Sequence, residues 1–312
     1  MHHEIQVKNK QKYHYLSENI RIGKNKWKKI RVYIGKGELS KKEINNLISK
    51  NKGKLELKVD QIKRKHDPLL SLLNEKEMNE LGKLRNSYQK SMKKIDKMVW
   101  QNYYEAFVTE FTYDTNAIEG SSVTLQETAL ILFDGIVPEG KTIKEIREVE
   151  NHKQAFDFML NHKGDLTKRF VLKLHKKLMH NILWKHAGKF RDVQVLIRGA
   201  NFVPPPPKKV ENEFKNLMRW YGSNKKKYNP VVVAAYFHFV FESIHPFRDG
   251  NGRAGRLLMN FILNKNGFPM IDIKNTNRME YYKSLQEAQE NTNLKPLVDL
   301  IVNYLKESKI WI

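Results

Sequence analysis

Cysteine is absent from the sequence, and its absence excludes disulfides, thiolate metal sites and a cysteine nucleophile. Long apolar runs are missing too, because no stretch approaches the roughly 18 residues that a membrane-spanning helix requires. The first ten residues, MHHEIQVKNK, lack the apolar core and the small-residue cleavage site of a secretory signal. We therefore expect a protein of the reducing cytoplasm with no membrane partner.

Acidic residues are scarce relative to basic ones: 57 Lys and Arg stand against 34 Asp and Glu, which gives a net charge of +23 at pH 7. The excess is concentrated in residues 1–66, which hold nineteen basic and six acidic side chains. Such a positive field attracts nucleic acid, acidic proteins or anionic membrane surfaces. A solvated, lysine-rich surface explains the same numbers, so charge alone does not decide whether residues 1–66 bind nucleic acid.

Residues 1–66 are predicted to form a small basic module with a β-hairpin and a helix. Apolar and polar residues alternate over 11–17 and 27–34, on either side of Gly23, which predicts a two-stranded hairpin. Ser40 and Glu43 form a capping box that begins a short helix near 41–50, and Asn51-Lys52-Gly53 ends it. The tract 54–66 is helical or irregular, and Asp67-Pro68 marks a break.

The rest of the chain is predicted to be mainly α-helical, as a helical region over 67–122 followed by a core over 123–312. The stretch Val231–Ile244 is apolar on nearly all faces, which is typical of the central helix of a bundle, and His238 within it is expected to be a core histidine. Gln194–Ile197 and Phe202–Val203 predict a small β-hairpin that ends at the prolines 204–207. Apolar spacing and capping boxes predict helices within 69–118 and near 125–134, 143–162, 167–182, 208–223, 230–244, 253–265, 278–290 and 295–308.

The chemistry is concentrated in one segment, HPFRDGNGRAGR, which runs from His245 to Arg256 directly after the apolar helix. Gly250 and Gly252 flank Asn251, and a turn of this kind can direct successive N–H groups at one anion. The turn begins the next helix, whose N-terminus also favours negative charge. Arg253 and Arg256 are three residues apart and therefore share one face of that helix. Together these features predict a cradle for polyphosphate.

Two further side chains complete this candidate site. Asp249 at the rim is a hard carboxylate of the kind that holds Mg²⁺ beside phosphates. His245 has a pKa suited to accepting a proton near neutrality. The cradle is neither a Walker loop nor a dinucleotide fingerprint, because no Gly-Lys-Ser/Thr follows and a helix precedes it. For a bare Gly-Asn-Gly, a structural turn with exposed arginines would be the better interpretation.

The segment resembles the Fic signature HPFx(D/E)GNGRxxR at every specified position. The resemblance implies a helical core with a β-hairpin flap, and transfer of AMP from ATP to a Tyr, Ser or Thr hydroxyl of a protein substrate. It also implies that His245 removes the hydroxyl proton, that Asp249 binds Mg²⁺, and that Phe247 anchors the loop. The phosphates of ATP would be held by Gly250, Asn251, Gly252, Arg253 and Arg256.

Three other segments agree with the same family. Thr115-Asn116-Ala117-Ile118-Glu119-Gly120 resembles the Fic inhibitory motif (S/T)xxxE(G/N), which implies that Thr115 and Glu119 inhibit the enzyme in the same chain. Tyr281, Tyr282 and Gln289 resemble the adenosine-side helix, although aromatics at such positions are often core residues. The flap is expected at Val195, Leu196, Ile197, Arg198 and Gly199.

The expected function is therefore that of an autoinhibited protein adenylyltransferase, with self-modification and a homodimer as further expectations of the resemblance. One alternative on the same fold is removal of AMP from a modified protein, with Glu119 positioning water. Another alternative is a nucleic-acid-binding regulator that acts through residues 1–66.

Overall fold

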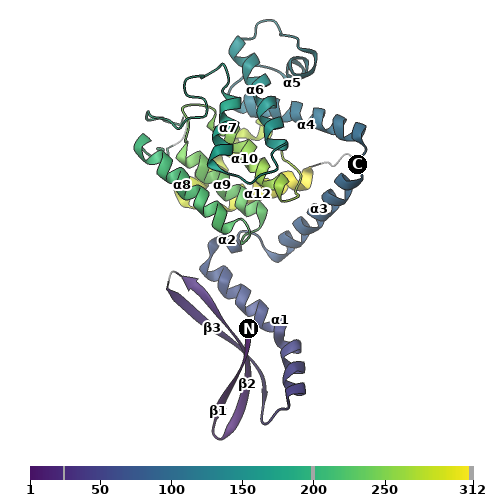
Figure 1. The fold of residues 1–312 in the computed structure, drawn as a ribbon, viewed down its shortest axis with the longest axis vertical. Helices are drawn as coiled ribbons and strands as arrows, with labels where there is room; N and C mark the ends of the chain where they lie inside the picture. The colour runs from purple at the N-terminus through teal and green to yellow at the C-terminus, as the bar shows by residue number, and fades with distance from the viewer. Residues whose placement is uncertain (24, 198–200, 309–312) are drawn as a thin grey trace. The chain divides into compact units, whose positions relative to one another are not determined.

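The computed structural model describes residues 1–23, 25–197 and 201–308. The chain forms two compact units, Met1–Asn74 and Glu75–Ile312, and helices dominate (Figure 1). None of the helices in the described ranges is long and apolar enough to cross a membrane.

The first unit contains a three-stranded antiparallel sheet instead of the predicted two-stranded hairpin. Its strands are β1 (His2–Lys8), β2 (Gln11–Gly23) and β3 (Lys26–Lys36), in the order β1-β2-β3. The sequence did not reveal β1 because none of its side chains is buried, so it has no core-facing alternation. Its backbone pairs with β2 from His2 opposite Ser17 to Lys8 opposite Gln11.

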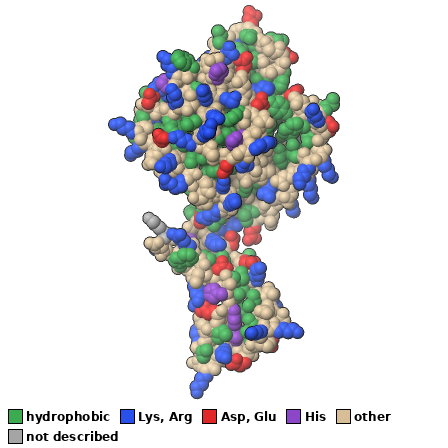
Figure 2. All heavy atoms as spheres, in the orientation of Figure 1, with side chains coloured by type: hydrophobic (Ala, Val, Ile, Leu, Met, Phe, Trp, Pro, Cys, Tyr) green, Lys and Arg blue, Asp and Glu red, His purple; other side chains and the backbone are tan. Residues whose placement is uncertain are grey.

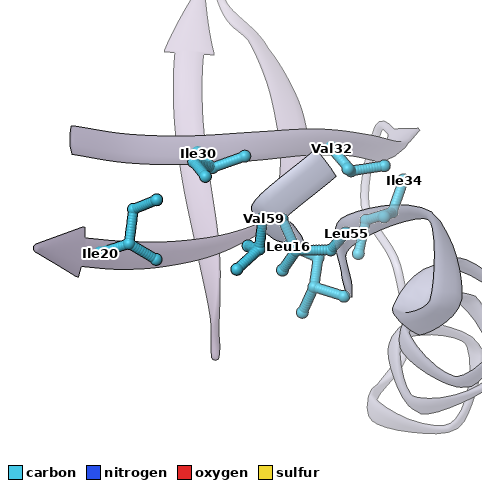
Figure 3. Close-up of a cluster of buried hydrophobic side chains, with 7 residues drawn as sticks. All are labelled: Leu16, Ile20, Ile30, Val32, Ile34, Leu55 and Val59. Carbon is cyan, nitrogen blue, oxygen red and sulfur yellow. The ribbon is translucent and has the colours of Figure 1, made fainter. Parts of the chain in front are cut away.

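Helix α1 (Lys41–His66) covers one face of this sheet and is longer than predicted. It begins at the expected capping box, in which Ser40 and Glu43 bond reciprocally. It continues through Asn51 and Gly53 because Leu55 and Val59 beyond them are buried against the sheet. That packing outweighs the cost of about 1 kcal/mol for a glycine inside a helix. Figure 3 shows the cluster, which comprises Leu16, Ile20, Ile30, Val32, Ile34, Leu55 and Val59.

The first unit also extends past the predicted boundary at residue 66. The short helix α2 (Pro68–Ser71) follows the break at Asp67-Pro68. The Arg64 guanidinium donates to the carbonyl oxygens of Leu70 and Leu73, at 2.7 and 2.9 Å. These bonds fasten the end of the unit to α1, so the unit ends at Asn74.

The second unit is a helical bundle built around α9 (Pro230–Ile244). This helix packs against α8 (Pro207–Asn224), α10 (Asn251–Lys265), α11 (Arg278–Asn291) and α12 (Lys295–Glu307). His238 is fully buried on it, as expected for a core histidine. The remaining elements are α3 (Glu75–Lys94), α4 (Lys97–Ile118), α5 (Leu125–Ala129), the π-turn η1 (Leu130–Asp134), α6 (Ile143–Leu160), α7 (Lys168–Leu178) and the 3₁₀ turn η2 (Asn275–Asn277).

The predicted flap hairpin is not formed in the described residues between α7 and α8. Residues 194–197 and 201–203 carry no strand, and Arg198 and Gly199 lie outside the described residues. Hydrogen bonds from side chains, and not pairing between backbones, connect the residues before this segment with the prolines after it. Gln194 Nε2 donates to the Pro204 carbonyl at 3.1 Å, and Arg191 donates to the carbonyls of Val193 and Pro205. The prolines 204–207 offer no N–H groups for pairing, which explains why alternation alone was a poor guide here.

Leu55→Ala tests whether the sheet–helix contact stabilises the first unit. Leu55 is fully buried, and its truncation should cost about 2–5 kcal/mol of local unfolding free energy. Leu57→Ala on the same helix is the matched control, because Leu57 is 56% exposed and its loss should cost less than about 0.5 kcal/mol. Amide hydrogen exchange over residues 1–74 of the full chain measures both. Equal protection in the two variants would show that this contact does not stabilise the unit.

Candidate active site

The candidate site begins where α9 ends. His245 caps this helix in the left-handed conformation, with φ 48° and ψ 62°, and its N–H donates to the Phe241 carbonyl at 2.9 Å. A left-handed backbone costs a non-glycine residue roughly 1–2 kcal/mol, so other contacts must hold it. Arg191 supplies them: its Nε donates to the His245 carbonyl at 2.8 Å, and its N–H donates to the Pro246 carbonyl at 2.9 Å.

The loop between α9 and α10 is fastened from inside. Phe247 is fully buried, and its N–H donates to Asn251 Oδ1 at 2.8 Å. Asn251 Nδ2 returns a bond to the Phe247 carbonyl at 3.0 Å. Gly250 then adopts φ 74° and caps α10, so the loop closes tightly before the helix starts. The predicted anchoring of the loop by Phe247 agrees with this burial.

His175 on α7 supports the loop, and sequence reasoning missed it. Its ring stacks on Phe247 with centroids 3.6 Å apart and planes 4° apart. Gly188 N–H donates to Nδ1 at 2.9 Å, which leaves Nε2 to donate to the Asp249 carbonyl at the same distance. Burial lowers the pKa of His175 to about 4, so the ring is neutral. Nothing local in the sequence pairs it with a residue 74 positions away.

Both arginines of the signature are buried, not exposed as an ordinary surface turn would leave them. Arg253 Nη1 lies 3.0 Å from a Glu148 carboxylate oxygen and 3.4 Å from Asn116 Oδ1. Its Nη2 lies 3.5 Å from Asp249 Oδ1. In the described part of the chain, its buried Nε has no hydrogen-bond partner. The Arg253 Nε–H is thus a buried donor without a partner among the described residues.

Arg256 is 1% exposed and connects α10 to the end of α4. Its Nε donates to Thr115 Oγ1 at 2.7 Å, and its Nη2 donates to the Thr115 carbonyl at 3.1 Å. Nη2 also lies 2.6 Å from Glu119 Oε1. Burial lowers the pKa of Arg256, but Glu119, Tyr281 and Glu242 together raise it by more, so the pKa lies above its ordinary value. The structure therefore brings together the predicted residues Thr115, Glu119 and Arg256.

The Glu119 carboxylate lies directly against the glycine turn. A Cβ atom at Gly252 would lie only 2.2 Å from Glu119 Oε1 and 3.1 Å from Arg256 Nη1. Glycine is therefore required at this position while the carboxylate is in place. Glu119 follows the last residue of α4, and its side chain remains 38% exposed. A negatively charged group thus fills the space beside the turn that was predicted to hold phosphate.

The three predicted adenosine-side residues lie around this centre. Tyr281 is 1% exposed, and its hydroxyl lies 2.9 Å from His238 Nε2 and 3.5 Å from Arg256 Nη1. Tyr282 is 42% exposed and donates to the Ile118 carbonyl at 3.1 Å. Gln289 Nε2 donates to Ser243 Oγ at 3.3 Å. Tyr282 is therefore the more accessible of the two tyrosines, whereas Tyr281 is buried against the Arg256 guanidinium.

Glu242, which sequence reasoning also missed, is buried beneath His245. Its Oε2 lies 4.0 Å from His245 Nδ1, and its Oε1 has no hydrogen-bond partner among the described residues. Gly255 makes room for it, since a Cβ atom there would lie 2.1 Å from Oε1. Burial raises the pKa of Glu242 to about 8, and burial lowers the pKa of His245 below 6.5. Both side chains are therefore neutral at pH 7.

Asp249 is better suited to bind a metal ion that enters together with a phosphate ligand than to hold a permanently bound metal ion. Its Oδ1 accepts from Gly250 N–H at 2.6 Å, and its side chain is 47% exposed. The described residues contain no group of three or more His, Asp or Glu side chains that could hold a metal. Mg²⁺ is commonly bound by one or two carboxylates together with substrate phosphates, and a single half-exposed carboxylate matches that requirement.

These features define a class of protein: a helical bundle with a glycine turn at a helix N-terminus, two buried arginines and an adjacent neutral histidine. The Fic/DOC family model matches residues 165–263, which include the whole turn. The chain belongs to the Fic family.

Relatives that are similar in sequence carry the name of the same family. The chain is 30% identical over 249 residues to "Protein adenylyltransferase fic-1" of Caenorhabditis elegans, which covers 77% of this chain and 47% of that protein. It is 34% identical over 195 residues to "Protein adenylyltransferase Fic" of Drosophila persimilis, covering 61% of this chain and 38% of that protein. The chain thus spans about half or less of the length of these relatives.

Solved structures show the same fold. Fic-1 of C. elegans superposes with a TM-score of 0.67 at 27% identity, over 85% of this chain and 83% of that chain. A Fic domain containing signaling protein from Bacteroides thetaiotaomicron gives a TM-score of 0.65 at 27% identity, over 72% and 94% of the two chains.

The raised pKa of Glu242 makes a prediction about stability. The folded state keeps the Glu242 proton up to about pH 8, whereas an unfolded glutamate releases it near pH 4.5. The free energy of unfolding of the wild type should therefore fall relative to Glu242→Gln between these pH values, by up to about 1.4 kcal/mol per pH unit.

Urea unfolding of both proteins at pH 5 and pH 8 measures this difference. The exposed glutamate Glu290 provides the control, because Glu290→Gln should leave the pH dependence unchanged. If the free energy of unfolding of the wild type does not fall relative to that of Glu242→Gln between pH 5 and pH 8, Glu242 is ionised in the folded protein.

Proposed function

We propose that this chain is a protein adenylyltransferase that transfers AMP from ATP to a Tyr, Ser or Thr hydroxyl of a protein. The observation that carries the proposal is that one tightly closed loop joins His245, at the end of α9, to the buried arginines Arg253 and Arg256 near the start of α10. The similar proteins are named protein adenylyltransferases, which supports the same activity.

The proposed reaction uses His245 as the general base. Its Nδ1 lies 3.4 Å from the Glu242 carbonyl oxygen, an acceptor, so the proton belongs on Nδ1 and the lone pair on Nε2. Nε2 takes the proton of the target hydroxyl as its oxygen forms a bond to the α-phosphorus. The bond from that phosphorus to the oxygen of the β-phosphate breaks, and pyrophosphate leaves. Arg253 and Arg256 stabilise the phosphate charge in a water-poor site.

Asp249 is the residue that would hold Mg²⁺ beside the phosphates. The ion supplies charge neutralisation for the departing pyrophosphate when it is bound. The flap residues that the structure describes, Val195, Leu196 and Ile197, would receive the target segment. Leu196 is 78% exposed, which suits a docking role.

His245→Ala tests the base. Loss of a general base typically costs ~10²–10⁴ in rate, while ATP binding and thermal stability should change little. Because burial lowers the pKa of His245, wild-type kcat/KM should be flat through neutrality and fall only below pH 6.5. The exposed His180 serves as the control through His180→Ala, which should leave the rate unchanged. Near-normal transfer of labelled AMP by His245→Ala would remove this residue from the mechanism.

We further infer that Glu119 inhibits this activity. Its carboxylate takes a donor of Arg256 at 2.6 Å and lies against Gly252, where a phosphate would have to come. Two anions then compete for one guanidinium. ATP bound beside Glu119 would have its phosphates displaced, and a misplacement of about 1 Å can cost ~10²-fold in rate.

Glu119→Gly should therefore raise AMP transfer, including self-modification. Glu119→Gln, which keeps the size but removes the charge, should give a smaller gain. The double variant Glu119→Gly with Arg256→Ala should resemble Arg256→Ala alone, because the phosphate ligand is lost in both. Incorporation from α-labelled ATP, on the protein itself and in a cell extract, measures all four.

Two results would change this assignment. A folded, ATP-binding Glu119→Gly protein that is no more active than wild type would show that Glu119 is not inhibitory. Loss of an AMP-removing activity in that variant would instead make Glu119 a residue of the reverse reaction. The labelled bands in the extract would also identify the target. A homodimer and a cytoplasmic location stay predictions.

A further inference from the structure

The sheet of the first unit has a second face that α1 does not cover. Residues that pair directly in an antiparallel sheet share a face. Ser17 pairs with Arg31, Asn19 with Lys29, and Arg21 with Trp27. The apolar residues on the alternating positions point to α1 instead. Ser17 is fully buried, so the open face, as the other residues of these pairs define it, presents cations, an amide and an indole.

Aromatic side chains extend the same face. Tyr15 pairs with Tyr33, and their rings meet edge-on with centroids 5.8 Å apart. The Tyr13 ring lies 6.4 Å from the Tyr33 ring. Trp27 is 66% and Tyr33 50% exposed. Because the tyrosine rings pack against one another, they form a rigid surface and are not separate platforms for unstacked bases.

Glu4 holds two cations extended across this face. Its carboxylate lies 2.9 Å from Arg31 Nη2 and 2.6 Å from Lys29 Nζ, both reached from β1 across the middle strand. Arg31 and Lys29 lower the pKa of Glu4, so it stays ionised. The acid thus fixes the cations in place and at the same time cancels part of their charge.

We propose that the open face binds duplex DNA in the major groove. Residues 1–74 hold nineteen Lys and Arg against seven Asp and Glu, which matches a polyanion. Arg, Lys and Asn side chains are suited to base edges and phosphates, whereas an apolar protein partner would find few aliphatic contacts here. Three strands about 4.8 Å apart span about 10 Å, which suits a groove about 12 Å wide.

Total charge alone does not single out this face. Figure 2 shows Lys and Arg side chains spread over the visible surface of both units. On the outer side of α1, Lys54 and Glu56 are exposed. These two residues provide substitutions with the same change of charge but no contact with the open face, so matched pairs can separate the face from the net charge.

The test uses the full chain and a fluorescent DNA duplex, with anisotropy measured over about 50 to 300 mM salt. Lys29→Gln should weaken binding and make the salt slope shallower by about 0.9, as loss of one phosphate contact does. Lys54→Gln should change neither. Glu4→Gln should tighten binding because it releases Arg31 and Lys29, and Glu56→Gln should not.

Several results would overturn the proposal. One is an equal effect of the two substitutions in either matched pair. Another is tighter binding of single-stranded DNA, RNA or an acidic protein than of the duplex. A third is the absence of duplex binding at the lowest salt. Circular dichroism and unfolding midpoints of the variants exclude loss of fold as the cause. The proposal stands apart from AMP transfer, since none of these residues belongs to the candidate active site.

Discussion

A buried guanidinium must keep an anion or a set of acceptors beside it, and Arg256 is the group on which the site depends. At 1% exposure it has little access to water, and leaving such a charge without a partner costs several kcal/mol. Thr115 and Glu119 now supply its partners. In the proposed function, inhibition and phosphate binding would be one requirement met by two different anions. The helix that carries Glu119 is held where it is by the same arginine that the nucleotide would use.

The loop that precedes α10, the helix of Arg256, is held in place by a distant part of the chain. His175 on α7 stacks on Phe247, donates to the Asp249 carbonyl and accepts the Gly188 N–H, and this last bond requires a neutral ring. Burial ensures that state by lowering its pKa to about 4. The left-handed residues His245 and Gly250 then change the chain direction within the loop. The turn is thus held by His175 from outside the signature as well as by the bonds between Phe247 and Asn251 within it.

The sequence could predict what is local and could not predict what is made by packing. The signature turn needs only twelve consecutive residues, so its shape and its arginines followed from their order. The pairing of Glu119 with Arg256, 137 positions apart, was reached only through a family pattern. Helix α1 was predicted too short because Gly53 is a local signal, whereas Leu55 is stabilised by a sheet. The prediction missed strand β1 and placed a hairpin before Pro204 for the same reason, since neither segment has a buried alternating face.

Glu242 shows why a site residue can be invisible in a sequence and still set the chemistry. An ionised carboxylate 4.0 Å from His245 would favour the protonated imidazole and so raise its pKa. Burial prevents this, because it keeps Glu242 protonated to about pH 8 and lowers the pKa of His245 as well. The histidine consequently keeps a free lone pair at neutral pH. Since Gly255 of α10 leaves space for the Glu242 carboxyl, the helix that follows the turn also influences how readily His245 accepts a proton.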